Sequence, residues 1–295
     1  MDPDLEKRMA DAAAPLDRLL VIIPTYNESD NLRPITDRIR AAVPEAHILV
    51  ADDNSPDGTG ALADELAGAD DHVHVLHRRG KEGLGAAYVA GFRWGLAEGY
   101  HVLVEHDADG SHQPEYLPAI LERLRTADAV KGSRYVKGGS TRGWPMHREL
   151  LSRGGNLWTQ LMLGLPVRDA TGGFVAWRAA TLEGMGLDGI EASGYGFQVE
   201  LVRRAIRSGF TIAEVPIEFV EREYGDSKMS GGIVAEAMLL TTRWGLAYRF
   251  GQARQVAGQV GETAGAAAKD AGRTAVRLRD RVARWWHDRS AGGRR

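Results

Sequence analysis

The sequence predicts an α/β fold with a mostly parallel sheet, and two observations carry this prediction. Short apolar runs alternate with segments of helical spacing from Leu19 to Lys131, which is the pattern of consecutive strand–helix units. Acidic residues follow directly after two of these runs, at the carboxyl ends of predicted strands, where parallel sheets form ligand crevices. The chain has 295 residues, of which 43% are hydrophobic, and is long enough for one large domain with an appendage.

Each element of the first half follows from its residue pattern. Short apolar runs predict strands at Leu19–Pro24, His47–Ala51, Val73–Leu76, Tyr100–Val104 and Ala127–Lys131. Helical spacing of apolar residues predicts helices at Asn31–Val43, Ala61–Leu66, Gly85–Ala97 and Tyr116–Arg125. Ser111 and Glu115, with Pro114 between them, form a capping-box pattern that predicts the start of the last helix.

The second half is less regular. A polar, Gly-rich segment at Gly138–Arg153 precedes an apolar helix predicted at Leu157–Leu165, and late strands are predicted at Phe174–Trp177 and Ile212–Ile217. We therefore expect four segments. They are a flexible N-terminal segment (1–18), one large domain (19–230), an amphipathic interfacial helix (231–250) and a basic, low-complexity tail (251–295) with a terminal amphipathic helix.

Composition excludes several classes of protein. The chain has no cysteine, which rules out disulfides and Cys-ligated metal sites. No secretory signal is visible in residues 1–17 and no apolar run reaches about 18 residues, so we expect no transmembrane helix and a cytoplasmic location. Residues 251–295 carry ten Lys/Arg and four Asp/Glu, whereas the rest carries 27 and 36. A basic tail on an acidic body suggests an anionic partner; the lack of an aromatic–basic groove favours a membrane over nucleic acid.

Asp107 and Asp109 form the first candidate site. They follow the predicted strand Tyr100–Val104, and residues two apart on an extended chain point the same way. Two neighbouring carboxylates are costly unless a cation lies between them, and a divalent metal that holds phosphates is the natural cation. The alternative is a solvated turn, because Asp and Gly are common in turns.

Two further loops follow predicted strands. In Pro24–Glu28, Tyr26 offers a stacking face and Glu28 an acceptor for a base or sugar; the alternative is a strand end that runs into a helix cap. Asp52–Thr59 contains three carboxylates, and Asp52 can accept from a nucleobase N–H; the alternative is an Asx-rich turn.

Basic residues supply the charges that phosphates require. The Gly-rich segment His77–Gly85 can cradle phosphates, but the chain lacks G-x-G-x-x-G after its first strand and also G-x-x-x-x-G-K-[ST], which argues against a nicotinamide site and a P-loop ATPase. Five residues near predicted element ends could bind phosphate oxygens as a set, although each alone suits a surface charge: Arg134, Arg148, Arg153, Arg222 and Lys228. We expect His106 and His112 to support the site or lie exposed, not to bind metal.

Taken in order, six motifs resemble one known family. They are Val21–Glu28 (VIIPTYNE), Asp52–Thr59 (DDNSPDGT), Asp107–Asp109 (DAD), Gly132–Val136 (GSRYV), Asp169–Phe174 (DATGGF) and Arg222 followed by Lys228. From about Leu19 to Ser230 the chain resembles family two glycosyltransferases of the GT-A (nucleotide-diphospho-sugar transferase) fold. Within that family it is similar to the dolichol-phosphate (polyprenol-phosphate) mannose synthases, and the S-P-D-G-T and G-S-R-Y-V runs are the most specific.

The resemblance implies an inverting, metal-dependent hexosyltransferase that moves mannose from GDP-mannose to a polyprenyl monophosphate and yields polyprenyl-phosphate-mannose. Carried over by position, the donor-binding residues are Pro24, Tyr26, Glu28, Val50, Asp52, Asp107, Ala108, Asp109, Arg222 and Lys228. Asp107 and Asp109 would hold Mg²⁺ or Mn²⁺ on the diphosphate. The acceptor-phosphate residues are Arg134, Arg148 and Ser152, and the catalytic set is Asp109, Arg134, Arg148 and Lys228.

The chain departs from the family pattern in two places. Ser111 stands where a Gln often provides a further metal ligand, so we expect water to complete the metal site. Gly172 replaces a Ser in the family's D-x-T-S-G-F, which predicts a looser loop. No general base is expected, because a phosphate monoester is already anionic at neutral pH.

A lipid acceptor requires a membrane contact. The predicted helix 233–250 has aromatic residues beside Arg243 and Arg249, a mixture that is typical of a membrane interface. The predicted helix 273–287 contains two Trp, five Arg and His287, which favour binding to anionic lipid. The alternative for the helix 233–250 is a core helix, and the alternative for the helix 273–287 is a disordered tail. An integral-membrane partner could also anchor the protein to the membrane. We expect a peripheral enzyme on the inner face of the membrane. Two other functions stay open: transfer from UDP-glucose or another sugar nucleotide, and a non-catalytic sugar-nucleotide or lipid-phosphate binding module.

Overall fold

The computed structural model describes residues 16–190, 194–221 and 238–246. The fold belongs to the first of two compact units, Met1–Arg243; the second begins at Trp244. Arg222, Lys228, most of the predicted helix 231–250 and the whole tail 251–295 lie outside the described residues, although residues 238–246 are helical. Within the described part of the chain, no helix is both long and apolar enough to cross a membrane.

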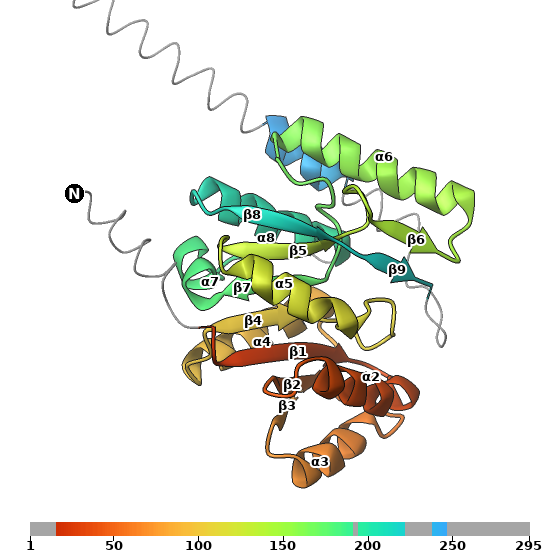
Figure 1. Cartoon of the computed structure of the whole chain (residues 1–295), viewed down its shortest axis with the longest axis vertical. Coiled ribbons are helices and arrows are strands. Elements are labelled where there is room, and N and C mark those ends of the chain that lie inside the picture. Colours follow the sequence, from red (N-terminus) through yellow and green to blue (C-terminus); the bar gives the residue numbers. More distant parts are fainter. Residues whose placement is uncertain (1–15, 191–193, 222–237, 247–295) are drawn as a thin grey trace, which may run out of the picture. The chain divides into compact units, whose positions relative to one another are not determined.

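A seven-stranded sheet forms the centre of the fold (Figure 1). Its spatial order is β3-β2-β1-β4-β7-β5-β8. The strands are β1 (Leu19–Thr25), β2 (His47–Asp52), β3 (Val73–His77), β4 (Val102–Glu105), β5 (Ala129–Ser133), β7 (Val175–Arg178) and β8 (Ile212–Pro216). All neighbours are parallel except β7, which runs antiparallel to β4 and β5. The predicted mostly parallel sheet is therefore confirmed.

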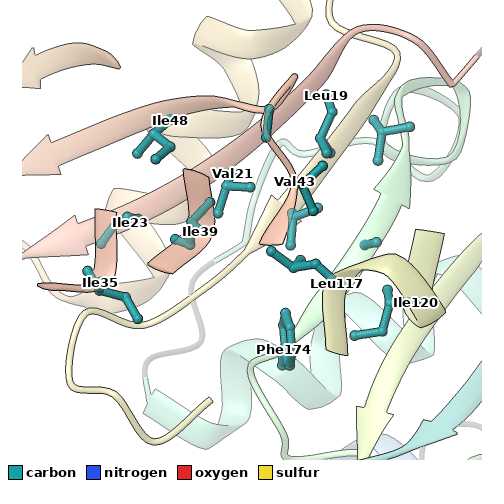
Figure 2. Close-up of a cluster of buried hydrophobic side chains, with 14 of the residues drawn as sticks. Leu19, Val21, Ile23, Ile35, Ile39, Val43, Ile48, Leu117, Ile120 and Phe174 are labelled. Carbon is teal, nitrogen blue, oxygen red and sulfur yellow. The ribbon is translucent and has the colours of Figure 1, made fainter. Parts of the chain in front are cut away.

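Helices cover both faces of the sheet. They are α2 (Ser29–Ala42), α3 (Thr59–Ala69), α4 (Leu84–Ala97), α5 (Leu117–Leu124), α6 (Met146–Leu163), α7 (Ala179–Met185) and α8 (Gly194–Arg207), with a 3₁₀ turn, η1, at Pro114–Tyr116. Alternate residues of β1 enter different cores, as the pleat requires: Val21 packs with Ile35 of α2 and Ile120 of α5 (Figure 2), whereas Ile22 packs with Phe92 of α4. The sheet is thus buried on both faces, which explains its continuous apolar strands.

Three parts of the second half differ from the sequence prediction. α6 begins at Met146, eleven residues before the predicted start, and takes in most of the segment expected to be polar loop. α7 and α8 were not predicted, nor was the small parallel sheet of β6 (Ser140–Arg142) and β9 (Glu218–Val220). The capping-box prediction is wrong, because Ser111 N donates to Asp109 Oδ1 at 3.0 Å and the 3₁₀ turn starts only at Pro114.

Candidate active site

The carboxyl ends of β1, β2 and β4 bring the acidic motifs to one edge of the sheet. From β1 the chain builds outward to β2 and β3 and then places β4 on the opposite side of β1, so the topology switches direction between β1 and β4. The register sets Thr25 beside Asp52 and Ile22 beside Glu105. Asp107 and Asp109 therefore leave the sheet at the point where a fold of this kind forms its ligand crevice.

Asp107 and Asp109 are held by different contacts. Tyr88 of α4 donates its hydroxyl to Asp107 Oδ1 at 2.8 Å, and burial, followed by the Asp107 charge, raises the pKa of Tyr88 well above its usual value. Asp109 accepts from the Ser111 amide, and Gly110 between them has φ +71°, which a glycine adopts without strain. Ala108 is buried in the core below. The turn and the carboxylate pair are therefore both present. Asp109 shapes the turn, and Asp107 is held by Tyr88 of α4.

His106 and His112 are buried beside these carboxylates, so of the two alternatives expected for them, an exposed position is excluded. Burial lowers the pKa of His106 to about 3 and that of His112 to about 4, which keeps both rings neutral at neutral pH. His112 Nδ1 lies 3.8 Å from Asp107 Oδ2 and is buried without a hydrogen bond among the described residues. Phe174 and Phe219 pack against the His112 ring and account for its burial.

The donor set around Asp107 suits a hard divalent cation only in part. Over the described ranges, no cluster of three or more His, Asp or Glu side chains is arranged to hold a metal. Two carboxylates with the neighbouring Ser111 offer the oxygen chemistry that Mg²⁺ and Mn²⁺ prefer. The protein therefore presents part of a coordination sphere, and phosphate oxygens of a bound nucleotide together with water are the groups that complete such spheres.

A second layer of buried charges lies under the acidic edge. Glu105 accepts from Trp177 Nε1 at 2.7 Å and from Gln198 Nε2, and burial raises its pKa to about 7. Lys131 of β5 is fully buried and donates its Nζ to the Gly172 carbonyl at 2.6 Å; burial lowers its pKa while nearby carboxylates oppose that shift. The Glu105 contacts join β4 to β7 and α8, and the Lys131 contact joins β5 to the loop at Gly172.

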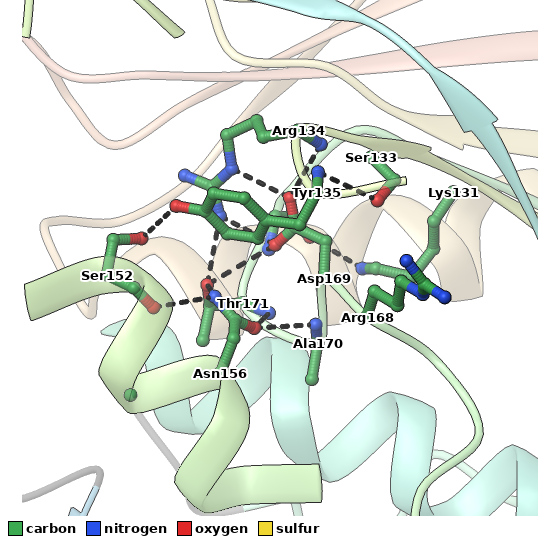
Figure 3. Close-up of polar contacts among 12 residues, drawn as sticks. Lys131, Ser133, Arg134, Tyr135, Ser152, Asn156, Arg168, Asp169, Ala170 and Thr171 are labelled. Atoms are coloured by element: carbon green, nitrogen blue, oxygen red, sulfur yellow. Dashed lines mark hydrogen bonds and ion pairs between the residues drawn. The ribbon is translucent and has the colours of Figure 1, made fainter. Parts of the chain in front are cut away.

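The loop Asp169–Gly173 is held by hydrogen bonds to Arg134 and to Asn156 of α6 (Figure 3). Asp169 accepts from Arg134 Nε at 2.7 Å and Nη2 at 2.6 Å, and also from the amide of Gly172 at 3.1 Å. Asn156 of α6 accepts from the amides of Ala170 and Thr171. Gly172 is bonded through both its amide and its carbonyl, and the looser loop predicted from this glycine stays a prediction.

The structure brings Arg134, Arg148 and Ser152 to one place. The Arg134 and Arg148 guanidinium groups lie 5.5 and 4.2 Å from the Trp144 ring centroid. Ser152 Oγ accepts from the Tyr135 hydroxyl at 2.6 Å. Arg134 is buried in its ion pair with Asp169, and Arg148 pairs with Glu221. Arg148 Nε and Trp144 Nε1 are buried and have no hydrogen-bond acceptor among the described residues.

Asp52 joins the two loops that follow β1 and β2. Its Oδ1 accepts from Thr25 Oγ1 at 2.9 Å and Ser55 Oγ at 2.6 Å, and its Oδ2 accepts from the Ser55 amide at 3.0 Å. Asn27 donates its amide to Ser55 Oγ at 3.1 Å, and both Asn27 and Asn54 adopt left-handed φ values near +60°. These are the hydrogen bonds of an Asx-rich turn, so the turn interpretation holds for the loop, and recognition of a base by Asp52 stays a prediction.

The other predicted donor residues lie along the same edge. Tyr26 is half-buried, and Lys81 Nζ lies 4.0 Å from its ring centroid. Glu28 accepts from Asn31 Nδ2 at 2.8 Å at the start of α2. Pro24 pairs with Ala51 across the sheet, whereas the Val50 side chain packs in the core, so only the Val50 backbone can face a ligand.

Several residues of the site were not predicted from the sequence. Tyr88, Lys131, Gln198 and Trp144 gave no local signal, because their partners lie far along the chain or on elements that were not predicted. Asp169 lay in a recognised motif, but nothing in the motif indicated that it pairs with Arg134. Arg153, included in the predicted basic set, pairs with Glu149, and its guanidinium lies 5.1 Å from the Tyr135 ring centroid.

Comparison with solved structures identifies the fold. Glucosyl-3-phosphoglycerate synthase from Mycobacterium tuberculosis in complex with phosphoglyceric acid matches with a TM-score of 0.57 at 21% identity, covering 80% of this chain and 81% of that chain. The same enzyme with Mn²⁺, uridine diphosphate and glucosyl-3-phosphoglycerate also matches with a TM-score of 0.57, at 22% identity over 79% and 81%. The expected α/β, GT-A-like fold is therefore confirmed.

Comparison with known sequences identifies the family. An undecaprenyl-phosphate mannosyltransferase from Micrococcus luteus is 59% identical over 79% of this chain and 96% of its own length. A polyprenol monophosphomannose synthase from Mycolicibacterium smegmatis is 54% identical over 82% of this chain and 92% of its own length. The model of the family described as glycosyl transferase family 2 matches residues 20–185. With more than half of its length matched, and with relatives this similar, the chain belongs to glycosyl transferase family 2.

Proposed function

We propose that this chain transfers mannose from GDP-mannose to a polyprenyl monophosphate with inversion, giving polyprenyl-phosphate-mannose. Two relatives at 59% and 54% identity carry names for transfer of mannose to a polyprenyl phosphate. The structural observation that most supports the proposal is a pair of buried donors, Arg148 Nε and Trp144 Nε1, that have no acceptor in the described part of the chain and lie beside the buried Arg134. Buried donors of this kind are suited to an anionic ligand, and a phosphate offers several acceptor oxygens.

The acceptor phosphate is proposed to bind Arg134, Arg148 and Ser152. Arg134 is held rigidly by Asp169, so its position is set before a ligand arrives. Arg148 stacks on Trp144, which restrains its long side chain and lowers the entropic cost of binding. Ser152 lies one helical turn after Arg148 on α6, and its hydroxyl can donate to a phosphate while it accepts from Tyr135.

The donor is proposed to bind along the ends of β1, β2 and β4. Pro24, Tyr26, Glu28, the Val50 backbone and Asp52 would hold the guanosine, and Asp107, Ala108 and Asp109 would face the diphosphate. Asp107 and Asp109 would hold Mg²⁺ or Mn²⁺, which when bound supplies Lewis-acid stabilisation of the leaving diphosphate. Arg222 and Lys228 would add positive charge there, although both lie outside the described residues.

The residues of this site would orient two anions rather than move a proton. The phosphate nucleophile carries its own charge, and both buried histidines are neutral with low pKa values, so neither is suited to act as a general base at neutral pH. The buried cations Lys131 and Arg134 are fixed by carbonyl and carboxylate partners, so their charges are already oriented before the reaction. The proposed role of this chain is therefore positioning and electrostatic stabilisation.

A transfer assay tests the proposal. Radiolabelled GDP-mannose is incubated with polyprenyl phosphate, with and without a chelator, and label is measured in the organic phase. We expect metal-dependent labelling, at least tenfold weaker labelling from UDP-glucose, and loss of labelling in Asp109→Ala. Lipid labelling only from UDP-glucose would favour the other sugar nucleotide, and binding without transfer would favour a non-catalytic module.

Arg148 and Arg142 provide a matched pair of variants for the acceptor site. Arg148→Gln removes the stacked guanidinium, whereas Arg142→Gln removes an exposed arginine six residues away whose nearest carboxylate, on Glu218, is 3.7 Å distant. We expect Arg148→Gln to raise the KM for polyprenyl phosphate at least tenfold with little change in the KM for GDP-mannose, and Arg142→Gln to leave both unchanged. Equal effects of the two substitutions would argue against an acceptor site at Arg148.

A further inference from the structure

The loop formed by residues 168–172 is held through its backbone amides by side chains. Five consecutive amides each donate to a side-chain oxygen: those of Arg168 and Asp169 to Glu214, those of Ala170 and Thr171 to Asn156, and that of Gly172 to Asp169. Backbone amides more often bond other backbone groups or water. The course of this loop is therefore set by three side chains, two of which belong to other elements, β8 and α6.

Glu214 provides both of its carboxylate oxygens to the start of the loop. Its Oε2 accepts from the Arg168 amide at 2.8 Å, and its Oε1 accepts from the Asp169 amide at 2.9 Å. Glu214 lies on β8, the last strand of the sheet, beside Lys131 of β5. Because the ladder between β5 and β8 fixes the backbone of Glu214, its two acceptor oxygens are presented at a defined place. A carboxylate is suited to this role, since a carboxamide can accept at only one of its two ends.

The position of Arg134 depends on the same loop. Asp169, whose amide is bound by Glu214, accepts from the Arg134 amide at 3.0 Å and from the guanidinium at 2.7 and 2.6 Å. Thr171 Oγ1 accepts from Arg134 Nη2 at 3.0 Å. Both members of the Arg134–Asp169 pair are buried, so the guanidinium has little room to move independently of the loop. A shift at the start of the loop would therefore shift the guanidinium.

We infer that Glu214 is a positioning residue for the acceptor phosphate, because by holding the amides of Arg168 and Asp169 it sets the place of the Arg134 guanidinium. The inference rests on the proposed function, in which Arg134 binds that phosphate. Glu214 acts through Asp169 and not through contact with the phosphate itself. A displacement of about 1 Å in a binding group is enough to lose much of its contribution, so a residue two contacts away from the ligand affects binding.

Positioning and charge predict opposite effects when Glu214 is changed. Glu214→Gln keeps the shape of the side chain but replaces one acceptor oxygen with an NH₂ group that faces a backbone N–H. If Glu214 positions Arg134, this substitution weakens phosphate binding. If Glu214 acted only as a negative charge beside Lys131, its removal would make the surroundings more positive, and phosphate binding would become tighter. The direction of the change thus separates the two roles.

Calorimetric titration with a short, water-soluble prenyl phosphate measures this binding without turnover. We expect Glu214→Gln to raise the Kd for the prenyl phosphate by about tenfold or more. The Kd for GDP with Mn²⁺ should stay the same, which also shows that the variant is folded. In the transfer assay the KM for the acceptor should rise while the KM for GDP-mannose stays the same.

Two further variants complete the test. Glu122→Gln is the matched control, since Glu122 lies on α5, is exposed and pairs with Arg125; it should leave both Kd values unchanged. Glu214→Asp keeps the charge and both oxygens but has a shorter side chain, so it should also weaken prenyl-phosphate binding. Unchanged or tighter binding of the prenyl phosphate by both Glu214 variants would overturn the inference.

Hydrogen exchange of the backbone amides gives a readout that does not depend on a ligand. The amides of Arg168 and Asp169 should exchange faster in Glu214→Gln than in the unaltered chain or in Glu122→Gln. Faster exchange there with unchanged prenyl-phosphate affinity would overturn the inference, because the start of the loop would then be released without effect on the site. Weaker binding with unchanged exchange would also overturn it, because Glu214 would then act by another route.

The inference and the proposed function fail in different ways. Prenyl-phosphate binding that depends on Glu214, without transfer from any sugar nucleotide, would contradict the proposed function alone. Transfer of mannose by a chain whose prenyl-phosphate affinity is independent of Glu214 would contradict the inference alone. Absence of prenyl-phosphate binding in the unaltered chain would contradict both.

Discussion

At the scale of single residues, the pair of Asp169 and Arg134 is the contact on which the site depends most. Both side chains are buried, and although burial opposes it, the Arg134 charge and its hydrogen bonds lower the pKa of Asp169 below its usual value. Asp169→Asn leaves a buried guanidinium without its counter-charge, so we expect the free energy of unfolding to fall by about 3–5 kcal/mol. Urea unfolding at neutral pH measures this.

A surface pair provides the control for this prediction. Arg33 and Glu65 are joined at 2.7 Å, but both side chains are largely exposed. Glu65→Gln should lower the free energy of unfolding by less than about 1 kcal/mol, because solvent screens exposed pairs. Similar losses in Asp169→Asn and Glu65→Gln would show that the buried pair contributes no more stability than an exposed pair.

The two carboxylates Asp107 and Asp109 could be located from the sequence, whereas their surroundings could not. A strand followed by D-x-D is a local pattern, so strand periodicity alone puts both residues at the edge of the sheet. The pairing of Arg134 with Asp169 joins residues 35 positions apart, and the burial of His112 depends on Phe219, more than a hundred residues away. Such contacts depend on the tertiary arrangement and leave no periodic signal in the chain.

At the scale of elements, the packing of α4 on the sheet depends on a glycine. A Cβ at Gly91 would lie 2.6 Å from Ile22 Cγ2, and Ile22 is a buried, β-branched residue of β1 with little freedom to move. We expect Gly91→Ala to lower the free energy of unfolding by about 1–3 kcal/mol through overpacking. This loss should exceed the gain of about 1 kcal/mol that alanine brings to a helix.

Gly68 in α3 is the matched control. It is exposed, and a Cβ there meets nothing within 4 Å, so Gly68→Ala should raise the free energy of unfolding by up to about 1 kcal/mol. Thermal or urea unfolding of the two variants should therefore shift in opposite directions. A stabilised Gly91→Ala protein would show that α4 can move away from β1 at no cost.

Helix α2 was predicted because its two faces follow the usual rule, whereas the first half of α6 was not predicted. In α2, Leu32, Ile35 and Ile39 face the core at helical spacing, so the pattern reveals the helix. In α6 the buried residues are Asn156, Thr159 and Leu163; Asn156 bonds the loop at Asp169–Gly173, and Gly154 and Gly155 reduce the helix propensity. The first half of α6 therefore has the composition of a loop, and its contacts with the site explain why it is helical.

At the scale of the whole molecule, the sheet separates a site at the carboxyl ends of its strands from a histidine pair near the amino ends. His47 Nδ1 and His74 Nε2 lie 2.8 Å apart, and Tyr100 hydroxyl lies 3.2 Å from the same His74 nitrogen. Burial lowers the pKa of both histidines. His72, Arg18 and Arg40 also lower the pKa of His47, whereas Glu98 and Asp70 partly oppose the shift at His74.

This pair predicts a loss of stability in mild acid. Because each folded-state pKa lies below the unfolded value of about 6.5, the unfolded chain binds more protons as the pH falls below that value. Stability from the pair is thus complete above about pH 6.5 and is lost as the pH drops through the lowered folded-state pKa values. His74→Gln should reduce the difference in unfolding free energy between pH 7.5 and pH 5.5, measured by urea unfolding at both.

The same variant checks that the two ends of the sheet act independently. His74 lies on β3, away from the carboxyl ends of β1 and β4 where the acidic motifs gather, so His74→Gln should transfer mannose at pH 7.5 as fast as the unaltered chain. An unchanged pH dependence of stability would mean that other groups, such as the buried His106 and His112, dominate the acid response. A loss of transfer at pH 7.5 with stability intact would instead show that the sheet couples its two ends.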